Sequence, residues 1–210
     1  MSQPHNSVSR KRSKYLEACV HAAATITMAL FIGSSTAIAA DAQPATQNIQ
    51  QIMQQQIKLM KPELQQKVKA LSPATKKLLM KILSQHSRYS ETATLRQVMT
   101  EVMQDYQSTV VGIMTENSEQ AADSALRLAN HRIPVGGLLP YLGLENINDE
   151  RLAILAGFND SVEGNAKKLA AAAEAGDMTE AASFLGPIST GCVSCHAVFR
   201  SQPGVSNLLR

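Results

Sequence analysis

Aromatic residues are scarce in this chain of 210 residues: they make up 4% of it, and tryptophan is absent. No segment alternates apolar and polar residues between turn signals for long, which argues against a β-sheet protein. Alanine, leucine, methionine, glutamine and lysine, which favour helices, are prominent instead. The sequence therefore predicts an all-α fold, in a chain long enough for one domain with an extension.

Long apolar runs are also scarce, and the run near residues 18–32 reads as part of an export signal. A positive segment precedes it (Arg10, Lys11, Arg12 and Lys14), and Ala37-Ile38-Ala39 is a cleavage pattern. We expect residues 1–39 to be removed as a signal peptide, which leaves an exported, soluble periplasmic chain with no membrane span. The alternative is an uncleaved membrane anchor.

The chain that remains after removal of the leader lacks a net charge. The leader holds four of the 20 Lys and Arg residues and one of the 17 acidic residues, so sixteen of each sign remain. The balance gives no sign of nucleic-acid binding. Charge is divided along the chain, because residues 41–91 hold eight positive and three acidic residues and residues 92–210 hold eight and thirteen. We expect a basic helical extension (40–92) before an acidic domain (93–210), acting as a packing arm or as a docking element for an acidic partner.

Apolar spacing of three and four residues predicts the helices. In the extension it favours helices over 49–71 and, after the Ser72 N-cap and Pro73, over 73–86. The domain has predicted helices over 94–115, 118–131, 149–175 and 179–199, with a kink caused by Pro187. A Pro- and Gly-rich loop, 131–140, should pack over one end of the domain. Four helices with mostly short connections predict a four-helix bundle.

Cysteine is scarcer still, since only Cys192 and Cys195 remain when Cys19 leaves with the leader. They begin the run Cys192-Val193-Ser194-Cys195-His196, the C-x-x-C-H pattern of c-type haem attachment. On a helix these three side chains project to neighbouring positions, so two thioethers hold the porphyrin and His196 binds the iron. We predict one covalent haem c, inserted into the core of the bundle.

The shortage of other ligands argues against rival interpretations of this motif. A structural zinc site needs a fourth ligand, and the exported chain has no further cysteine. A thioredoxin-like pair expects a preceding strand, which the sequence lacks. A plain disulfide leaves His196 unexplained. Export agrees with haem attachment, which in bacteria takes place outside the cytoplasm.

The last two helices carry a family resemblance. Gly176-Asp177, Phe184 and the run 192–200, which ends His-x-x-Phe-Arg, are similar to the cytochrome c prime family of class II c-type cytochromes. Leu95-Arg96-Gln97 resembles the Tyr-Arg-Gln that opens the family's first helix, so the likeness covers about 94–200. The basic extension and the Pro/Gly loop depart from the family.

The resemblance implies a non-enzymatic, one-electron carrier between redox partner proteins. The alternative it offers is a five-coordinate haem protein that binds NO or CO, as a carrier or sensor. It also implies that Arg200 lies near the haem edge and Arg96 near the propionates. The alternative for each arginine is a solvated surface charge, and it applies most to Arg96. Many members form homodimers through their first two helices.

The sixth iron ligand stays open at this stage. A Met on the first helix marks the family's six-coordinate members, and Met99 and Met103 are available. The family's distal position falls on Thr100, so Met99 requires a shift of one residue, and Met99 is equally explained as a core residue. His131 is a further candidate, but we expect it at the surface near a helix C-terminus. His86, in the extension, is the remaining histidine.

Overall fold

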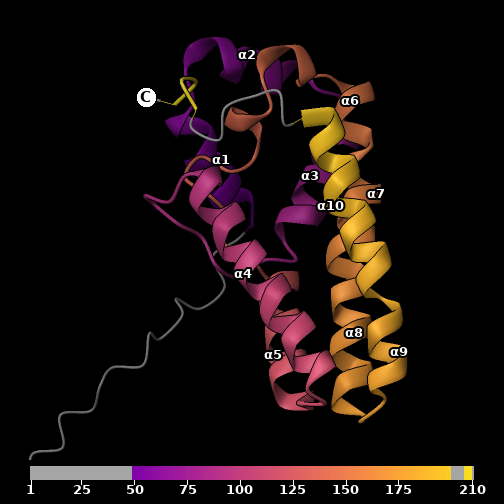
Figure 1. Cartoon of the computed structure of the whole chain (residues 1–210). Coiled ribbons are helices and arrows are strands. Elements are labelled where there is room, and N and C mark those ends of the chain that lie inside the picture. The colour runs from indigo at the N-terminus through magenta and orange to yellow at the C-terminus, as the bar shows by residue number, and fades with distance from the viewer. Residues whose placement is uncertain (1–48, 200–205, 210) are drawn as a thin grey trace, which may run out of the picture. The chain divides into compact units, whose positions relative to one another are not determined.

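The chain is mostly helical over the part that the computed structural model describes, residues 49–199 and 206–209 (Figure 1). These ranges contain no strand, so the all-α prediction is confirmed. The α-helices are α1 (Ile49–Leu59), α2 (Pro62–Ala70), α3 (Pro73–Leu83), α4 (Leu95–Met114), α5 (Ser118–Ala129), α6 (Asp149–Ala153), α7 (Leu155–Asn159), α8 (Asn165–Glu174), α9 (Met178–Ser183) and α10 (Leu185–Phe199). Shorter turns are 3-10 helical (Leu139–Tyr141, Leu144–Asn146) or π-helical (Asp160–Gly164).

Helices α2 and α3 begin where the sequence supplies a start signal. Pro62 and Pro73 occupy the first turn of α2 and α3, where a missing N–H costs no hydrogen bond. The Ser72 side chain accepts a hydrogen bond from the backbone N–H of Thr75, so the predicted N-cap is confirmed. The predicted helix over 49–71 is divided between α1 and α2, because the proline at 62 ends the first of them.

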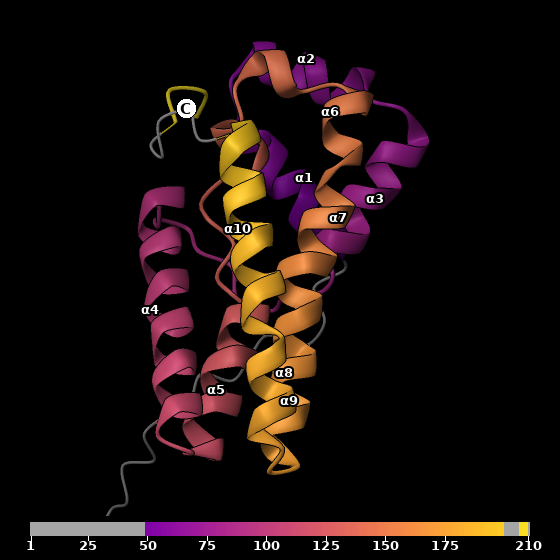
Figure 2. The same ribbon diagram turned by 45° about the vertical axis from the view of Figure 1, so that its right-hand side comes forward.

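Helices α4 and α5 form a hairpin (Figure 2). Thr94 and Gln97 exchange hydrogen bonds in a capping box that starts α4, and Asn117 caps α5. The two helices approach so closely that a Cβ added to Gly112 would lie 2.5 Å from the backbone nitrogen of Ala121. The helices predicted over 94–115 and 118–131 are therefore confirmed, with bounds that differ by two residues at most.

The helix predicted over 149–175 is interrupted, so the expectation of one continuous helix is wrong. A turn at Ile154 separates α6 from α7, and the π-helical turn separates α7 from α8. A π turn widens the hydrogen-bond spacing to five residues and accommodates one extra residue. Helix α10 packs tightly here, since a Cβ added to Gly191 would lie 2.7 Å from Cγ2 of Val162.

The chain reverses after α8 at the predicted stop signal. Gly176 has a φ of +79°, which glycine adopts without steric cost, and the Asp177 side chain caps α9. The last predicted helix divides at Phe184 into α9 and α10. The ring of Pro187 would clash with the carbonyl four residues earlier, on Ser183, and α9 ends at that residue. The predicted interruption by Pro187 therefore occurs about one turn before the proline itself.

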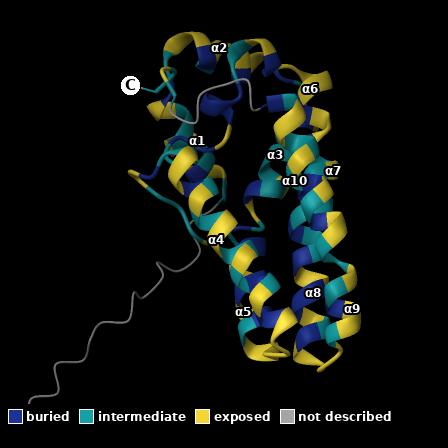
Figure 3. Ribbon diagram, viewed as in Figure 1, coloured by how far each residue is buried: buried dark blue, intermediate teal, exposed yellow. Residues whose placement is uncertain are grey.

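Two large buried clusters hold the described helices together (Figure 3). The first joins α4, α5, α8, α9 and α10 largely through alanines, which let the helices approach closely. The second joins the extension to α6, α7 and α10, through Met60, Leu64, Val68, Leu71, Leu152, Leu155 and Phe199. The Pro/Gly loop adds Leu139 to it, as expected of a packed loop, and Leu142 follows just after the loop. Helices α1–α3 thus share one core with the predicted domain.

One helical stretch in the described ranges, Met178–Phe199, is long and apolar enough by length and composition to cross a membrane. Core helices of water-soluble proteins pass the same test. The expectation of no span after the leader therefore remains a prediction. The leader itself, residues 1–39, lies outside the described residues.

Candidate functional site

A cavity of about 410 Å³ lies between the N-terminal half of α4 and the C-terminal half of α10, which stand apart in Figures 1 and 2. The two helices are joined at Tyr106 and Ser189, whose hydroxyls form a 2.6 Å hydrogen bond. Residues of α1, α3, α7 and the Pro/Gly loop complete the walls. The volume falls within the range of roughly 300–1,000 Å³ that is usual for small-molecule and cofactor sites.

The predicted haem-attachment residues lie on the α10 wall of this cavity. Cys192, Cys195 and His196 all line it, because residues three and four apart share one face of a helix. Both thiols are free and half-buried, and His196 is exposed. Burial raises the pKa of Cys192, and burial together with the neighbouring Cys192 raises the pKa of Cys195 to about 11. Both sulfurs therefore carry protons at neutral pH.

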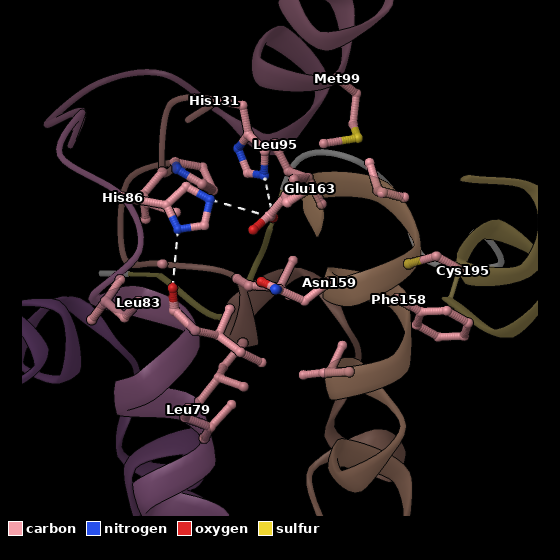
Figure 4. Close-up of a pocket in the computed structure, with 18 of the residues that line it drawn as sticks. Leu79, Leu83, His86, Leu95, Met99, His131, Phe158, Asn159, Glu163 and Cys195 are labelled. Carbon is pink, nitrogen blue, oxygen red and sulfur yellow. Dashed lines mark hydrogen bonds and ion pairs between the residues drawn. The ribbon is translucent and has the colours of Figure 1, made fainter. Parts of the chain in front are cut away.

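The α4 wall holds the N-terminal part of an apolar stripe, with residues three and four positions apart, that continues to Ile113. Leu95, Met99 and Val102 are only half-buried and line the cavity, whereas Val98 is fully buried. The stripe is therefore core only at its far end, where Ile113 is buried in the first cluster, because its N-terminal residues face the cavity. Figure 4 shows the sulfur atoms of Met99 and Cys195 extending into the cavity from different walls. Met103 also lines the cavity but is 51% exposed.

Three polar side chains form a further part of the wall, which we call the His86–His131–Glu163 cluster (Figure 4). Nε2 of His86 and Nε2 of His131 each lie 3.3 Å from Oε1 of Glu163. The side chains of His86, Glu163 and His131 are 1%, 8% and 20% exposed. The expectation that His131 is a surface residue is therefore wrong, since its ring turns inward to the carboxylate.

The other ring nitrogen of each histidine faces a backbone carbonyl. Nδ1 of His86 lies 3.1 Å from the Ile82 oxygen, and Nδ1 of His131 lies 3.0 Å from the Arg132 oxygen. Because a carbonyl only accepts, each Nδ1 carries the hydrogen. Both Nε2 atoms are thus directed at the carboxylate of Glu163.

Burial, hydrogen bonds and charge within the cluster shift the pKa values of His131 and Glu163. Burial lowers the pKa of His131, but its hydrogen bonds to Glu163 and to the Arg132 carbonyl outweigh burial, so the pKa lies above its usual value. Burial raises the pKa of Glu163, but the hydrogen bond from His131 and the nearby imidazoles of His131 and His86 outweigh it, so that pKa lies below its usual value. Both shifts favour the ionised forms.

The two arginines predicted near the haem have different positions. Arg96 is exposed on α4 and is not among the residues that line the cavity. Arg200 lies outside the described residues. His196 and Met99 are brought to the same cavity, as is His131.

The sequence alone did not predict that His86, Asn159 and Glu163 line the cavity. His86 follows α3 in the segment regarded as an extension, and only the tertiary fold carries it to the cavity. A signal was present for the other two residues. Asn159 and Glu163 are polar and four residues apart, and each directly follows an apolar residue of the same helical spacing, Phe158 or Val162.

No protein family, curated protein or solved structure matches the chain. Its chemistry must therefore be inferred from the cavity. One wall offers two sulfur atoms and an imidazole, and another offers two imidazoles and a carboxylate. Both sets consist of side chains that bind metals or metal-containing cofactors.

Proposed function

We propose that the protein is an exported monohaem c-type cytochrome with a four-helix-bundle haem domain, which carries single electrons between partner proteins in the periplasm. The observation that carries the proposal is the position of Cys192, Cys195 and His196 on one wall of the cavity. The C-x-x-C-H pattern alone predicts a haem, and a cavity beside it supplies room for one.

The residues around the cavity fit a haem. The two cysteine thiols are free to form thioethers, and neither is paired in a disulfide. Apolar side chains of α4 and α7, such as Val102, Leu155 and Phe158, form much of the remaining wall, which suits a porphyrin face. When bound, the haem supplies an iron that takes up and releases one electron. The exposure of His196 and Val193 leaves this side of the cavity open to a redox partner.

Electron transfer is favoured over gas binding by one observation, the position of Met99. Its side chain lines the cavity from α4, whereas the C-x-x-C-H motif lines it from α10, so Met99 would be available as the sixth ligand of a bound haem. A thioether ligand raises the reduction potential of a haem and closes the site to gases. Without that ligand, the same chain would bind NO or CO at the open position.

Haem attachment is tested by expressing residues 40–210 with a haem-maturation system. We expect one haem per chain that resists acid–acetone extraction. Cys192→Ala and Cys195→Ala should each remove one thioether and shift the pyridine haemochrome band, and the double variant should lose covalent haem. A wild-type chain without covalent haem contradicts the proposal.

The sixth ligand is tested in the haem-loaded protein. We expect a low-spin ferrous spectrum that CO leaves unchanged in the wild type and in Met114→Ala, a control on the same helix whose side chain is 71% exposed. Met99→Ala should become high-spin and bind CO, whereas His131→Ala should stay low-spin. A wild type that is already high-spin and binds CO would favour the gas-binding function.

A further inference from the structure

We propose that the His86–His131–Glu163 cluster is a binding site for a divalent transition-metal ion, for which Zn²⁺ is the probe. This site is separate from the C-x-x-C-H motif and uses none of its residues. It goes beyond the proposed function, since it requires no haem.

The ligand set points to a transition metal. Two imidazole nitrogens and one carboxylate oxygen bind Zn²⁺ and similar ions, whereas Ca²⁺ and Mg²⁺ prefer oxygen ligands alone. All the ligand atoms lie within 4.8 Å of one another. The 3.3 Å separations of the two Nε2 atoms from Glu163 Oε1 are close to the edge of a tetrahedron of ligands about 2.0 Å from a zinc ion.

The hydrogen bonds of the histidines prepare them for a metal. Each Nδ1 donates to a backbone carbonyl, an arrangement that commonly fixes the ring of a metal-binding histidine. In the neutral form of each ring, Nε2 then presents a lone pair to the carboxylate of Glu163. A cation among these atoms, either a proton on one ring or a metal ion, removes the repulsion between the lone pairs and the carboxylate.

Unpartnered polar atoms point to a ligand in the same place. Among the described residues, the buried side-chain atoms without a hydrogen-bond partner are His86 Nε2, Glu163 Oε2 and Asn159 Oδ1. All three residues line the cavity, and Figure 4 shows them directed toward one region of it. A buried polar atom without a partner is costly, so their gathering at one position favours a bound ion.

The backbone supplies an independent observation. Glu163 lies in the π-helical turn Asp160–Gly164, and π turns within α-helices occur frequently at functional sites. The three ligands come from different parts of the chain, since His86 follows α3, His131 follows α5 and Glu163 precedes α8. A metal ion would therefore link the extension to the rest of the molecule.

Zinc binding is tested with residues 40–210 in two forms, the haem-loaded protein and a Cys192→Ser/Cys195→Ser variant without thiols. After EDTA treatment and gel filtration, zinc per chain is measured by mass spectrometry, and affinity by competition with a coloured chelator. We expect one zinc per chain in both forms, and a zinc X-ray absorption spectrum with nitrogen and oxygen neighbours but no sulfur.

Substitutions assign the ion to the cluster. Glu163→Gln, which keeps the side-chain volume, should weaken zinc binding by at least roughly 100-fold, because loss of an outer-shell partner alone costs about 10- to 100-fold. His86→Ala should do the same. Glu174→Gln, an exposed position on α8, should bind as the wild type does. Circular dichroism checks that each variant is folded, and zinc should raise the unfolding temperature of the wild type but not of Glu163→Gln.

Three results would overturn the inference: no zinc in either form, zinc lost with the thiols, or zinc unchanged in a folded Glu163→Gln. Failure of the haem proposal gives a different result, a chain without covalent iron that still takes up zinc.

Discussion

Buried polar residues in this chain differ in how well they are satisfied. Thr109 and Asn146 donate to backbone carbonyls four residues earlier, as helical polar residues often do. His86, Asn159 and Glu163 instead retain unpartnered atoms, each of which costs about 1–3 kcal/mol when buried without water or an ion. The buried polar atoms that lower the stability of the fold therefore lie at the cavity, where a ligand bound to them would remove this cost.

A single exposed carboxylate connects two helices. Asp149, in the first turn of α6, accepts a hydrogen bond of 3.0 Å from the backbone N–H of Ser72, the N-cap of α3. The hydrogen bond from the Thr75 hydroxyl is the largest cause, and that from Ser72 the next, of a pKa for Asp149 below its usual value. A lowered pKa in the folded state means that the carboxylate stabilises the fold when it is ionised.

The pH dependence of this contact has a definite sign. Its stabilisation is complete above the unfolded pKa of about 3.9 and is lost as the pH falls through the lower folded value. Asp149→Asn, which keeps an acceptor oxygen but not the charge, should unfold at a lower temperature than the wild type at pH 6. The difference between their unfolding temperatures should shrink as the pH falls below about 4.

The measurement is a series of thermal unfolding curves between pH 6 and pH 3. Asp123→Asn, at an exposed position of α5, is the matched control and should show a smaller difference at every pH. A constant difference between Asp149→Asn and the wild type would contradict the assigned role.

Glycine decides how two pairs of elements pack. At Gly112 the backbone of α5 is so close to α4 that no Cβ fits, and at Gly191 of α10 side-chain atoms of Ser161 and Val162 in the π-helical turn occupy the place of a Cβ. At Gly157 of α7, in contrast, nothing lies within 4 Å of an added Cβ. The first two positions require glycine for its size, and the third does not.

Substitution by alanine should therefore change stability in opposite directions. Gly112→Ala forces α4 and α5 apart, since the Cβ would meet backbone atoms, and should cost about 1–3 kcal/mol. Gly157→Ala should stabilise the protein by about 0.4–1 kcal/mol, because alanine restricts the unfolded chain without strain in the helix. Urea unfolding measures both changes. Equal stability of the two variants would show that the close approach of α4 to α5 is not needed.

The extension is part of the whole molecule's core. Met60, Leu64 and Val68 are buried against residues of α6, α7 and α10, and Met53, Leu79 and His86 line the cavity. The exposed lysines of these helices lie outside this core (Lys58, Lys67, Lys69, Lys77 and Lys81). The two expected roles of the extension, a packing arm and a basic docking element, therefore do not exclude each other.

Removal of the extension should expose apolar surface. We expect residues 93–210 alone to lose the cooperative unfolding of the longer chain and to bind the dye ANS, because Leu152, Leu155 and Phe199 lose their partners. Residues 40–210 are the comparison, studied by thermal circular dichroism and ANS fluorescence. A shortened chain that unfolds cooperatively without ANS binding would instead establish residues 93–210 as an independent domain.

Local sequence signals determined most of the helices and the C-x-x-C-H motif of this protein. Caps and breakers such as Ser72, Thr94 and Gly176 act through atoms within a few residues of one another, so their effects follow from sequence spacing. The same holds for Cys192, Cys195 and His196, which share a helix face by spacing alone. Only the tertiary structure decided that the apolar stripe of α4 lines a cavity, and that His86, His131 and Glu163 meet. Those contacts join residues 32 to 77 positions apart in the sequence, and helical periodicity carries no information about which distant faces pack together.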